Sequence, residues 1–189
     1  MAMQIVAFSA TPRKSGNSDI LADHILAGAK EAGASVEKVR LQGLTIRPCT
    51  ACEACQKQLE TPCVQDDDMA GLLEKTRRAD GIVVASPIYF FSVNAQMKAY
   101  LDRLYAVFGG GRFDALKGKH AALALTYGDP DPLSSGAANA LGMFRDAGRF
   151  LGLEIAGCVH AACGEAGEIR SNPKALTAAE ALGRKLATA

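Results

Sequence analysis

The sequence carries almost no net charge: 21 Lys and Arg residues stand against 20 Asp and Glu residues, which leaves +1 at pH 7. A protein that binds a nucleic-acid backbone or an acidic membrane usually has a basic surface, and this balance gives no sign of one. An acidic electron carrier that docks by charge is disfavoured for the same reason. We therefore expect neither a nucleic-acid partner nor a membrane partner.

Long apolar runs are also missing, since no stretch reaches the ~18 residues that a membrane span requires. The first eight residues are apolar but lack a basic flank, and Thr11 to Lys14 follow too soon for a secretory signal. We expect a cytoplasmic protein, in which thiols stay reduced. The six cysteines then need a reason other than structural disulfides.

The 189 residues suit one domain, which we expect over 1–189 with a Cys-rich insertion at about 43–65. Strands are expected at 5–8, 36–41, 81–85, 121–126 and 153–160, and helices at 19–32, 66–78, 92–108, 136–151 and 173–187. This alternation predicts an α/β fold, a doubly wound five-stranded parallel sheet with helices on both faces. Such sheets bind ligands beyond the carboxyl ends of their strands, so the loops after the first, third and fourth strands are candidates.

The loop after the first strand leads into a helix, and its composition favours an anion such as a phosphate. Five of its side chains can donate hydrogen bonds, one glycine permits close approach of the backbone, and one arginine adds charge. These residues are Ser9, Thr11, Ser15, Asn17 and Ser18, with Gly16 and Arg13. The loop matches neither the P-loop nor the dinucleotide fingerprint. The alternative is a polar turn in which Ser18 or Asn17 caps the helix.

The loop after the third strand is unusually aromatic, holding three of the chain's 11 Phe and Tyr residues. Aromatic side chains beyond strand ends suit a flat ring ligand. The candidates are Pro87, Ile88, Tyr89, Phe90 and Phe91, and after the fourth strand Tyr127 and Gly128. Alternatively, some of the aromatic side chains fill the core and the Gly128 segment is a plain turn. We expect at least one of Phe90 and Phe91 to be in the core.

Four cysteines cluster in the expected insertion as Cys49-x2-Cys52-x2-Cys55-x7-Cys63. Three cysteines at this spacing can turn their sulfurs toward one point, and a fourth can complete a four-thiolate site. The spacing is that of iron–sulfur ligation. A zinc site would use the same ligands, and a redox-active dithiol is a third reading. Cys158 is expected to fill space in the last strand.

Taken together, these motifs resemble the iron–sulfur flavoproteins, which belong to the wider NAD(P)H-dependent FMN reductase group of flavodoxin-like proteins. The resemblance extends from Gln4 to about Leu153. It rests on residues 9–18, the cysteine array, Asp67-Asp68-Met69, Ser86-Pro87-Ile88-Tyr89 and residues 97–103.

The resemblance implies a flavodoxin-like sheet of strand order 2-1-3-4-5. It implies that FMN binds with its phosphate at the first loop and its ring at residues 87–91. It further implies a [4Fe–4S] cluster near the flavin, held by Cys49, Cys52, Cys55 and Cys63, and a homodimer or homotetramer in which a cluster can serve a neighbour's flavin.

The favoured function is that of an FMN-dependent oxidoreductase in which electrons pass between bound FMN and a [4Fe–4S] cluster, with NAD(P)H as a possible donor. No side chain needs to act as acid or base, and no catalytic triad is recognisable. One alternative is a cluster-free NAD(P)H-dependent FMN or quinone reductase. A second is a non-enzymatic flavin electron carrier for a ferredoxin-like partner. A third is a module that is stabilised by a zinc ion and has no redox function.

Overall fold

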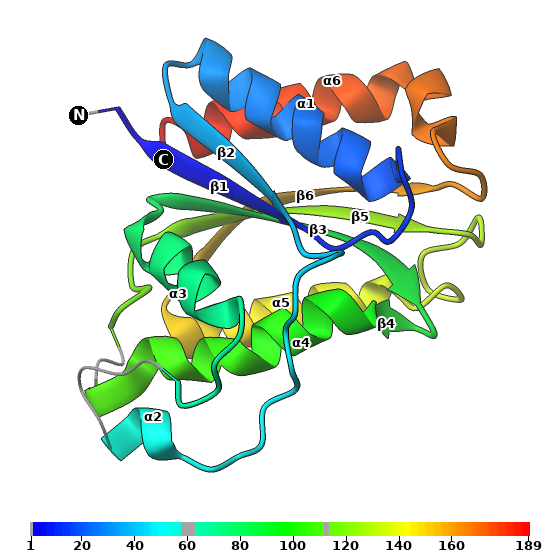
Figure 1. Cartoon of the computed structure of the whole chain (residues 1–189). Helices are drawn as coiled ribbons and strands as arrows, with labels where there is room; N and C mark the ends of the chain where they lie inside the picture. Colours follow the sequence, from blue (N-terminus) through cyan, green and yellow to red (C-terminus); the bar gives the residue numbers. More distant parts are fainter. Residues whose placement is uncertain (1, 58–62, 112–113) are drawn as a thin grey trace.

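The computed structural model describes residues 2–57, 63–111 and 114–189, and the described part forms a sheet covered by helices on both faces (Figure 1). The strands are β1 Gln4–Ser9, β2 Ser35–Arg40, β3 Gly81–Tyr89, β4 Ser92–Val93, β5 His120–Tyr127 and β6 Glu154–Ala162. The helices are α1 Asn17–Glu31, α2 Ala54–Lys57, α3 Met69–Arg78, α4 Ala95–Arg103, α5 Ala137–Leu151 and α6 Pro173–Leu186, with 3-10 turns η1 Leu104–Gly111 and η2 Glu168–Ser171. Within these residues, no helix is long and apolar enough to cross a membrane.

The predicted fold class is confirmed. The parallel strands follow the order β2-β1-β3-β5-β6, which is the expected order of five, and the short β4 is an addition that pairs antiparallel with β3. The central strand β3 is buried from Gly81 to Ile88, as expected for a strand with helices on both sides. Two apolar clusters form the core: one beneath α1 and α6, the other beneath α3, α4 and α5.

The end of β3 differs from the prediction. The strand was expected to stop at Ala85 because Pro87 cannot donate to a ladder, yet Pro87 lies inside it and pairs with Thr126 of β5. The reason is that β1 pairs with β3 only as far as Ala85, so beyond this point no strand needs the missing N–H on that side.

The aromatic segment is therefore a hairpin turn rather than an open loop. Phe90 and Phe91 connect β3 to β4, with φ values of 46° and 67°, a left-handed backbone that favours glycine and asparagine. Phe90 is 95% exposed and Phe91 55% exposed, so the expectation that one of them enters the core is wrong. A two-residue turn places both side chains at its tip, away from the core. Strained backbone of this kind is characteristic of functional sites.

Helices α1 and α6 pack unusually closely because each presents a glycine to the other. A Cβ added at Gly28 would overlap the Glu180 carbonyl, and one at Gly183 would overlap the Ile25 carbonyl. In α3, by contrast, a Cβ at the exposed Gly71 would meet nothing within 4 Å.

The Gly183→Ala variant is therefore expected to lower the free energy of unfolding by about 1–3 kcal/mol, since overpacking forces the two backbones apart. The Gly71→Ala variant is the matched control and should raise it by about 0.5–1 kcal/mol, because glycine is a poor residue inside a helix. Urea unfolding of both variants measures the two effects. Equal stability of the two would contradict the close packing.

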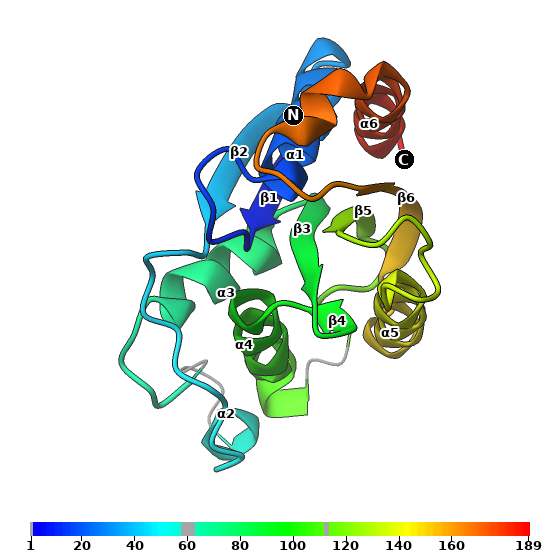
Figure 2. The same cartoon turned by 90° about the vertical axis from the view of Figure 1, so that its right-hand side faces the viewer.

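The strand order creates a crevice at the carboxyl ends of the strands. From β1 the chain leaves into α1 on one face, whereas from the neighbouring strand β3 it continues through β4 into α4 on the other face, so the two connections diverge between β1 and β3. Figure 2 looks onto this edge, where the loop after β1, the β3–β4 turn and the segment after β6 surround the strand ends. Asn94, which begins α4, ties two of these segments together, donating 2.7 Å to the Ala10 carbonyl and receiving a 3.2 Å hydrogen bond from Ser86.

Candidate functional site

A cavity of about 250 Å³, here called the strand-end cavity, lies at the predicted place. Four segments line it: the loop after β1, the end of β3, the end of β5 and the chain after β6. Its lining residues are Thr11, Arg13, Gly16, Asn17, Pro87, Ile88, Tyr89, Thr126, Tyr127, Gly128, Cys163 and Gly164. Most of the predicted cofactor-binding residues are thus brought together.

The predicted residues that do not line the cavity have different positions. Ser9 and Ser18 are buried beside it, and Ser15 is exposed in the loop with φ 54°. Phe90 and Phe91 are at the hairpin tip, in edge-to-face contact at 5.6 Å between ring centroids.

The start of α1 has the features of an anion site. Among the described residues no side chain caps this helix, whose N-cap is Gly16, so the reading of the loop as a simple helix cap by Ser18 or Asn17 is wrong. The Ser9 and Ser18 hydroxyls are buried and have no hydrogen-bond partner within the described residues. Buried hydroxyls left unpaired cost about 1–3 kcal/mol each, so the loop is built for an acceptor that protein atoms do not supply.

The loop of residues 163–168, which the sequence analysis missed, closes over the first loop. Arg13 donates from Nη1 to the Gly164 carbonyl at 2.8 Å, and Asn17 donates to the Glu165 carbonyl at 2.7 Å. Glu168 in turn accepts from the N–H groups of Gly164 and Glu165. No sequence motif marks this loop, because its partners are about 150 residues away along the chain.

Tyr127 lines the strand-end cavity from the end of β5. Its hydroxyl is 2.8 Å from Nδ1 of His160 on the neighbouring strand β6. Burial, reinforced by the nearby negative charge of Asp131, raises the pKa of Tyr127, so the phenol stays neutral. Tyr89, 42% exposed, lines the same cavity from the end of β3, the strand that pairs with β5.

The four predicted cysteine ligands line one second cavity, here called the cysteine cavity, together with Arg103, Tyr105 and neighbouring residues. Several of its sulfurs have hydrogen-bond donors: Ala51 N–H reaches Cys49 Sγ at 3.5 Å, and the Ala54 N–H, followed by the Thr50 hydroxyl, lowers the pKa of Cys52. As the chain is described, no group of three His, Cys, Asp or Glu side chains is arranged to hold a single metal ion.

A buried ion pair anchors the cysteine cavity to the core. The side chain of Arg103 is 1% exposed and that of Asp67 0% exposed, and the two form a bidentate pair at 2.8 and 3.0 Å. Asp67 also accepts from the N–H groups of Arg47 and Met69. Burial alone would raise the pKa of Asp67, but these hydrogen bonds, led by that from Arg103, lower it to about 2.

The depressed pKa predicts an acid-sensitive contribution to stability. A carboxyl whose pKa falls from 3.8 unfolded to about 2 folded stabilises the native state by about 2 kcal/mol above pH 4, and this is lost as the pH falls toward 2. Urea unfolding at pH 5, 3 and 2 should show that the unfolding free energy of the wild type approaches that of the Asp67→Asn variant, which does not titrate at this position, as the pH falls. A difference in unfolding free energy that stays constant over this pH range would contradict the ion pair.

The two candidate cavities lie at opposite ends of α4. Asn94, at the start of the helix, contacts the loop after β1, whereas Arg103, its last residue, lines the cysteine cavity (Figure 1). Nine residues at 1.5 Å each put about 14 Å between these two positions. The two candidate sites are therefore separated along α4, and the expectation that flavin and cluster lie close together stays a prediction.

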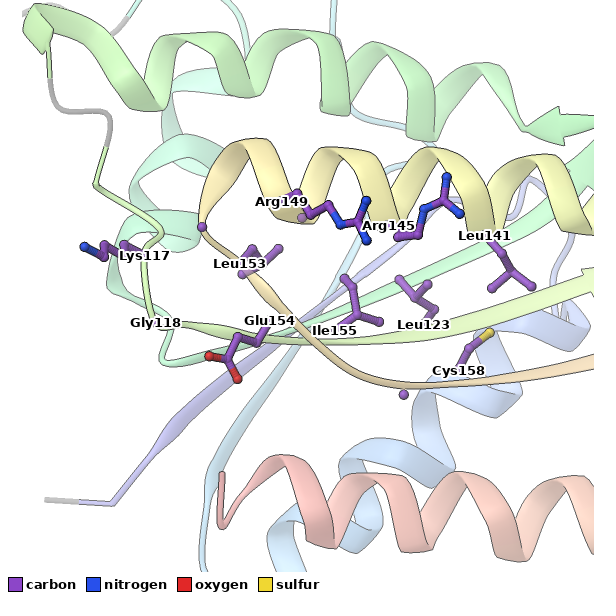
Figure 3. Close-up of a pocket in the computed structure, with 13 residues that line it drawn as sticks. Lys117, Gly118, Leu123, Leu141, Arg145, Arg149, Leu153, Glu154, Ile155 and Cys158 are labelled. Carbon is purple, nitrogen blue, oxygen red and sulfur yellow. The ribbon is translucent and has the colours of Figure 1, made fainter.

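A third cavity, of about 730 Å³, lies between α5 and β6 and contains none of the predicted site residues (Figure 3). Leu123, Leu153 and Ile155 form an apolar floor, with Arg145 and Arg149 above them on α5. Cys158 lines it too, and burial raises the pKa of this thiol to about 12, as suits a space-filling residue.

A family model and several known proteins match much of this chain. The family model described as NADPH-dependent FMN reductase matches residues 3–168. An iron–sulfur flavoprotein of Archaeoglobus fulgidus is 36% identical over 125 residues, which are 66% of this chain and 54% of that protein. One from Methanosarcina thermophila is 43% identical over 101 residues, 53% of this chain and 52% of that protein. The chain thus matches about half the length of these relatives.

Solved structures support the fold. The NAD(P)H:quinone oxidoreductase of Methanothermobacter marburgensis superimposes with a TM-score of 0.75 at 17% identity, covering 98% of each chain. A flavodoxin from the domain Archaea gives 0.61 at 16% identity, covering 98% of this chain and 97% of that one. At such identities the likeness shows a shared fold, in agreement with the flavodoxin-like sheet expected from the sequence.

Proposed function

Because the chain belongs to the NADPH-dependent FMN reductase family, we propose that it is an FMN-dependent oxidoreductase that also carries a [4Fe–4S] cluster and takes electrons from NAD(P)H. FMN would occupy the strand-end cavity. Its phosphate would lie at the start of α1 and its ring between the end of β3 and Tyr127.

The observation that carries the proposal is that, among the described residues, the buried hydroxyls of Ser9 at the end of β1 and of Ser18 at the start of α1 have no hydrogen-bond partner and no side chain caps the helix. A phosphate group accepts hydrogen bonds from hydroxyls and helix N–H groups alike and is favoured by the helix dipole. Gly16 lines the cavity, and Arg13 adds a positive charge that its hydrogen bond to the Gly164 carbonyl does not neutralise. These groups therefore fit a phosphorylated flavin better than one without phosphate.

The cluster would be held by Cys49, Cys52, Cys55 and Cys63. All four line one cavity, and Arg103 in the same lining has a buried Nε–H without an acceptor among the described residues. A single zinc ion needs its ligands to converge on one point, whereas a four-iron cluster takes one thiolate at each of four irons. Thiols spread around a cavity suit the cluster better.

When bound, FMN supplies transfer of hydride or of single electrons, and the cluster supplies one-electron steps. The protein's own residues bind and orient. The first loop would hold the phosphate, Tyr89 and Tyr127 would line the ring site, and the loop of residues 163–168 holds Arg13 and Asn17 in place through its carbonyls. Because α4 separates the two cavities, we propose a homodimer or homotetramer in which each cluster exchanges electrons with a neighbour's flavin.

A cluster-free NAD(P)H-dependent FMN or quinone reductase is the second candidate. It is favoured by the exposure of Cys49 and Cys52 and by the lack of a three-ligand group among the described residues.

Anaerobic purification followed by absorbance, iron and flavin analysis separates the two. The proposal predicts one FMN and ~4 Fe per chain, with the Cys52→Ala variant losing iron but keeping FMN. The second candidate would be established if the wild-type protein contained no iron and the Cys52→Ala variant oxidised NAD(P)H as fast as the wild type. Failure to take up FMN would refute both.

A further inference from the structure

We propose that Arg103 is a positioning residue for the cluster. Its guanidinium donates a hydrogen bond to the sulfur of Cys63, and this hydrogen bond raises the reduction potential of the cluster. This inference rests on the cluster of the proposed function. It assigns a role to a residue that touches one ligand from the core side, at the last position of α4.

The contacts account for every hydrogen on the two terminal nitrogens of Arg103. Nη1 donates to Asp67 Oδ2 and to the Arg47 carbonyl, both at 2.8 Å. Nη2 donates to Asp67 Oδ1 at 3.0 Å and to Cys63 Sγ at 3.4 Å. The carboxylate thus locks the plane of the guanidinium, and the locked plane directs one N–H at the sulfur. A lysine at this position could not make the two parallel hydrogen bonds to the carboxylate, because its side chain ends in a single nitrogen.

Cys63 differs from the other cysteines in how it is held. Cys49 receives its hydrogen bond from the N–H of Ala51, two residues further on, and Cys55 from the side chain of the next residue, Gln56, at 3.5 Å; both are local contacts. Cys63 receives its bond from a side chain that is 1% exposed and 40 residues away in sequence. Of the sulfurs whose bonds are described, Cys63 is therefore the one tied directly to the core.

A hydrogen bond to a ligand sulfur favours the reduced cluster. One-electron reduction adds a negative charge to the iron–sulfur unit and its thiolates, and an N–H aimed at a sulfur stabilises that charge. Arg103 keeps its proton throughout, since a guanidinium does not deprotonate in proteins. Only the electron moves, and the donor that replenishes it is the flavin of the proposed function.

The test compares two arginines that contact the same carboxylate. Arg103→Lys removes the directed N–H but keeps a positive charge. Arg47→Gln is the matched control, because Arg47 approaches Asp67 at 3.6 Å from the surface, with its side chain 53% exposed. Iron content, FMN content and the cluster's midpoint potential are measured on anaerobically purified holoprotein.

At a fixed potential, we expect the ratio of reduced to oxidised cluster in Arg103→Lys to be about tenfold lower, a shift of ~59 mV. The FMN content of both variants and the cluster's midpoint potential in Arg47→Gln should stay at wild-type values. An unchanged potential in iron-loaded Arg103→Lys, or an equal shift in Arg47→Gln, would overturn the inference.

A second measurement needs no variant at position 103. Holoprotein labelled with ¹⁵N-arginine should show a weak nitrogen hyperfine coupling to the reduced cluster, retained in Arg47→Gln. If the coupling is missing, the inference fails while the cluster stands. If wild-type protein binds FMN but contains no iron, the cluster proposal fails and takes the inference with it.

Discussion

The Asp67→Ala variant is expected to lose about 3–5 kcal/mol of unfolding free energy, the largest effect on stability that we expect from one substitution. The change leaves Arg103 with an unpaired charge at a position that is 1% exposed. It also removes the acceptor of the Arg47 and Met69 N–H groups. Urea unfolding at pH 7, monitored by circular dichroism, measures the loss.

Two further variants make this result specific to the ion pair. Asp66→Ala alters the neighbouring exposed carboxylate and should stay within about 0.5 kcal/mol of wild type. The double variant Asp67→Leu/Arg103→Met replaces both charges by apolar groups and should recover much of the loss, because the cost comes from burying one unpaired charge. A loss in Asp66→Ala as large as that in Asp67→Ala would contradict the account.

Gly16→Val is expected to weaken FMN binding by about 100-fold, which corresponds to about 2.7 kcal/mol. A Cβ at position 16 would overlap the Thr11 side chain, so the first loop must move. The movement displaces the N–H groups at the start of α1 from the place where the phosphate would bind. Because Thr11 and Gly16 both line the strand-end cavity, it also pushes side chains into that cavity.

Titration of apoprotein with FMN, followed by quenching of flavin fluorescence, measures this change. Gly142→Ala is the control, because a Cβ at this position in α5 meets nothing within 4 Å and the residue lies outside the strand-end cavity. It should bind FMN as the wild type does. Wild-type affinity in Gly16→Val would show that the phosphate does not lie at the start of α1.

The sheet and its order could be predicted because their signals are local. Runs such as Ile82-Val83-Val84 mark strands, and amphipathic stretches mark helices whatever lies elsewhere in the chain. The first loop was recognisable for the same reason, since its hydroxyls and Gly16 lie within ten residues. The cysteine array was visible as spacing, and all four cysteines do line one cavity.

The features that escaped prediction depend on distant partners. Pro87 suggests a strand end unless one knows that β1 stops short of it. Arg103 falls in the helix predicted at 92–108 with no local signal that it is buried, yet Asp67, 36 positions earlier, pairs with it in the core. The loop of residues 163–168 has no motif of its own and matters because Arg13 and Asn17 bind its carbonyls. In each case the stabilising contact joins residues that are far apart in the sequence, so the local pattern of residue types does not reveal it.

The most direct test of the central claim is a comparison of FMN and riboflavin binding to the same apoprotein. If the start of α1 and the hydroxyls of Ser9 and Ser18 are a phosphate site, FMN binds at one per chain and riboflavin, which lacks the phosphate, binds at least ~100-fold more weakly. Equal affinity for the two flavins, or no binding of either, would contradict the account.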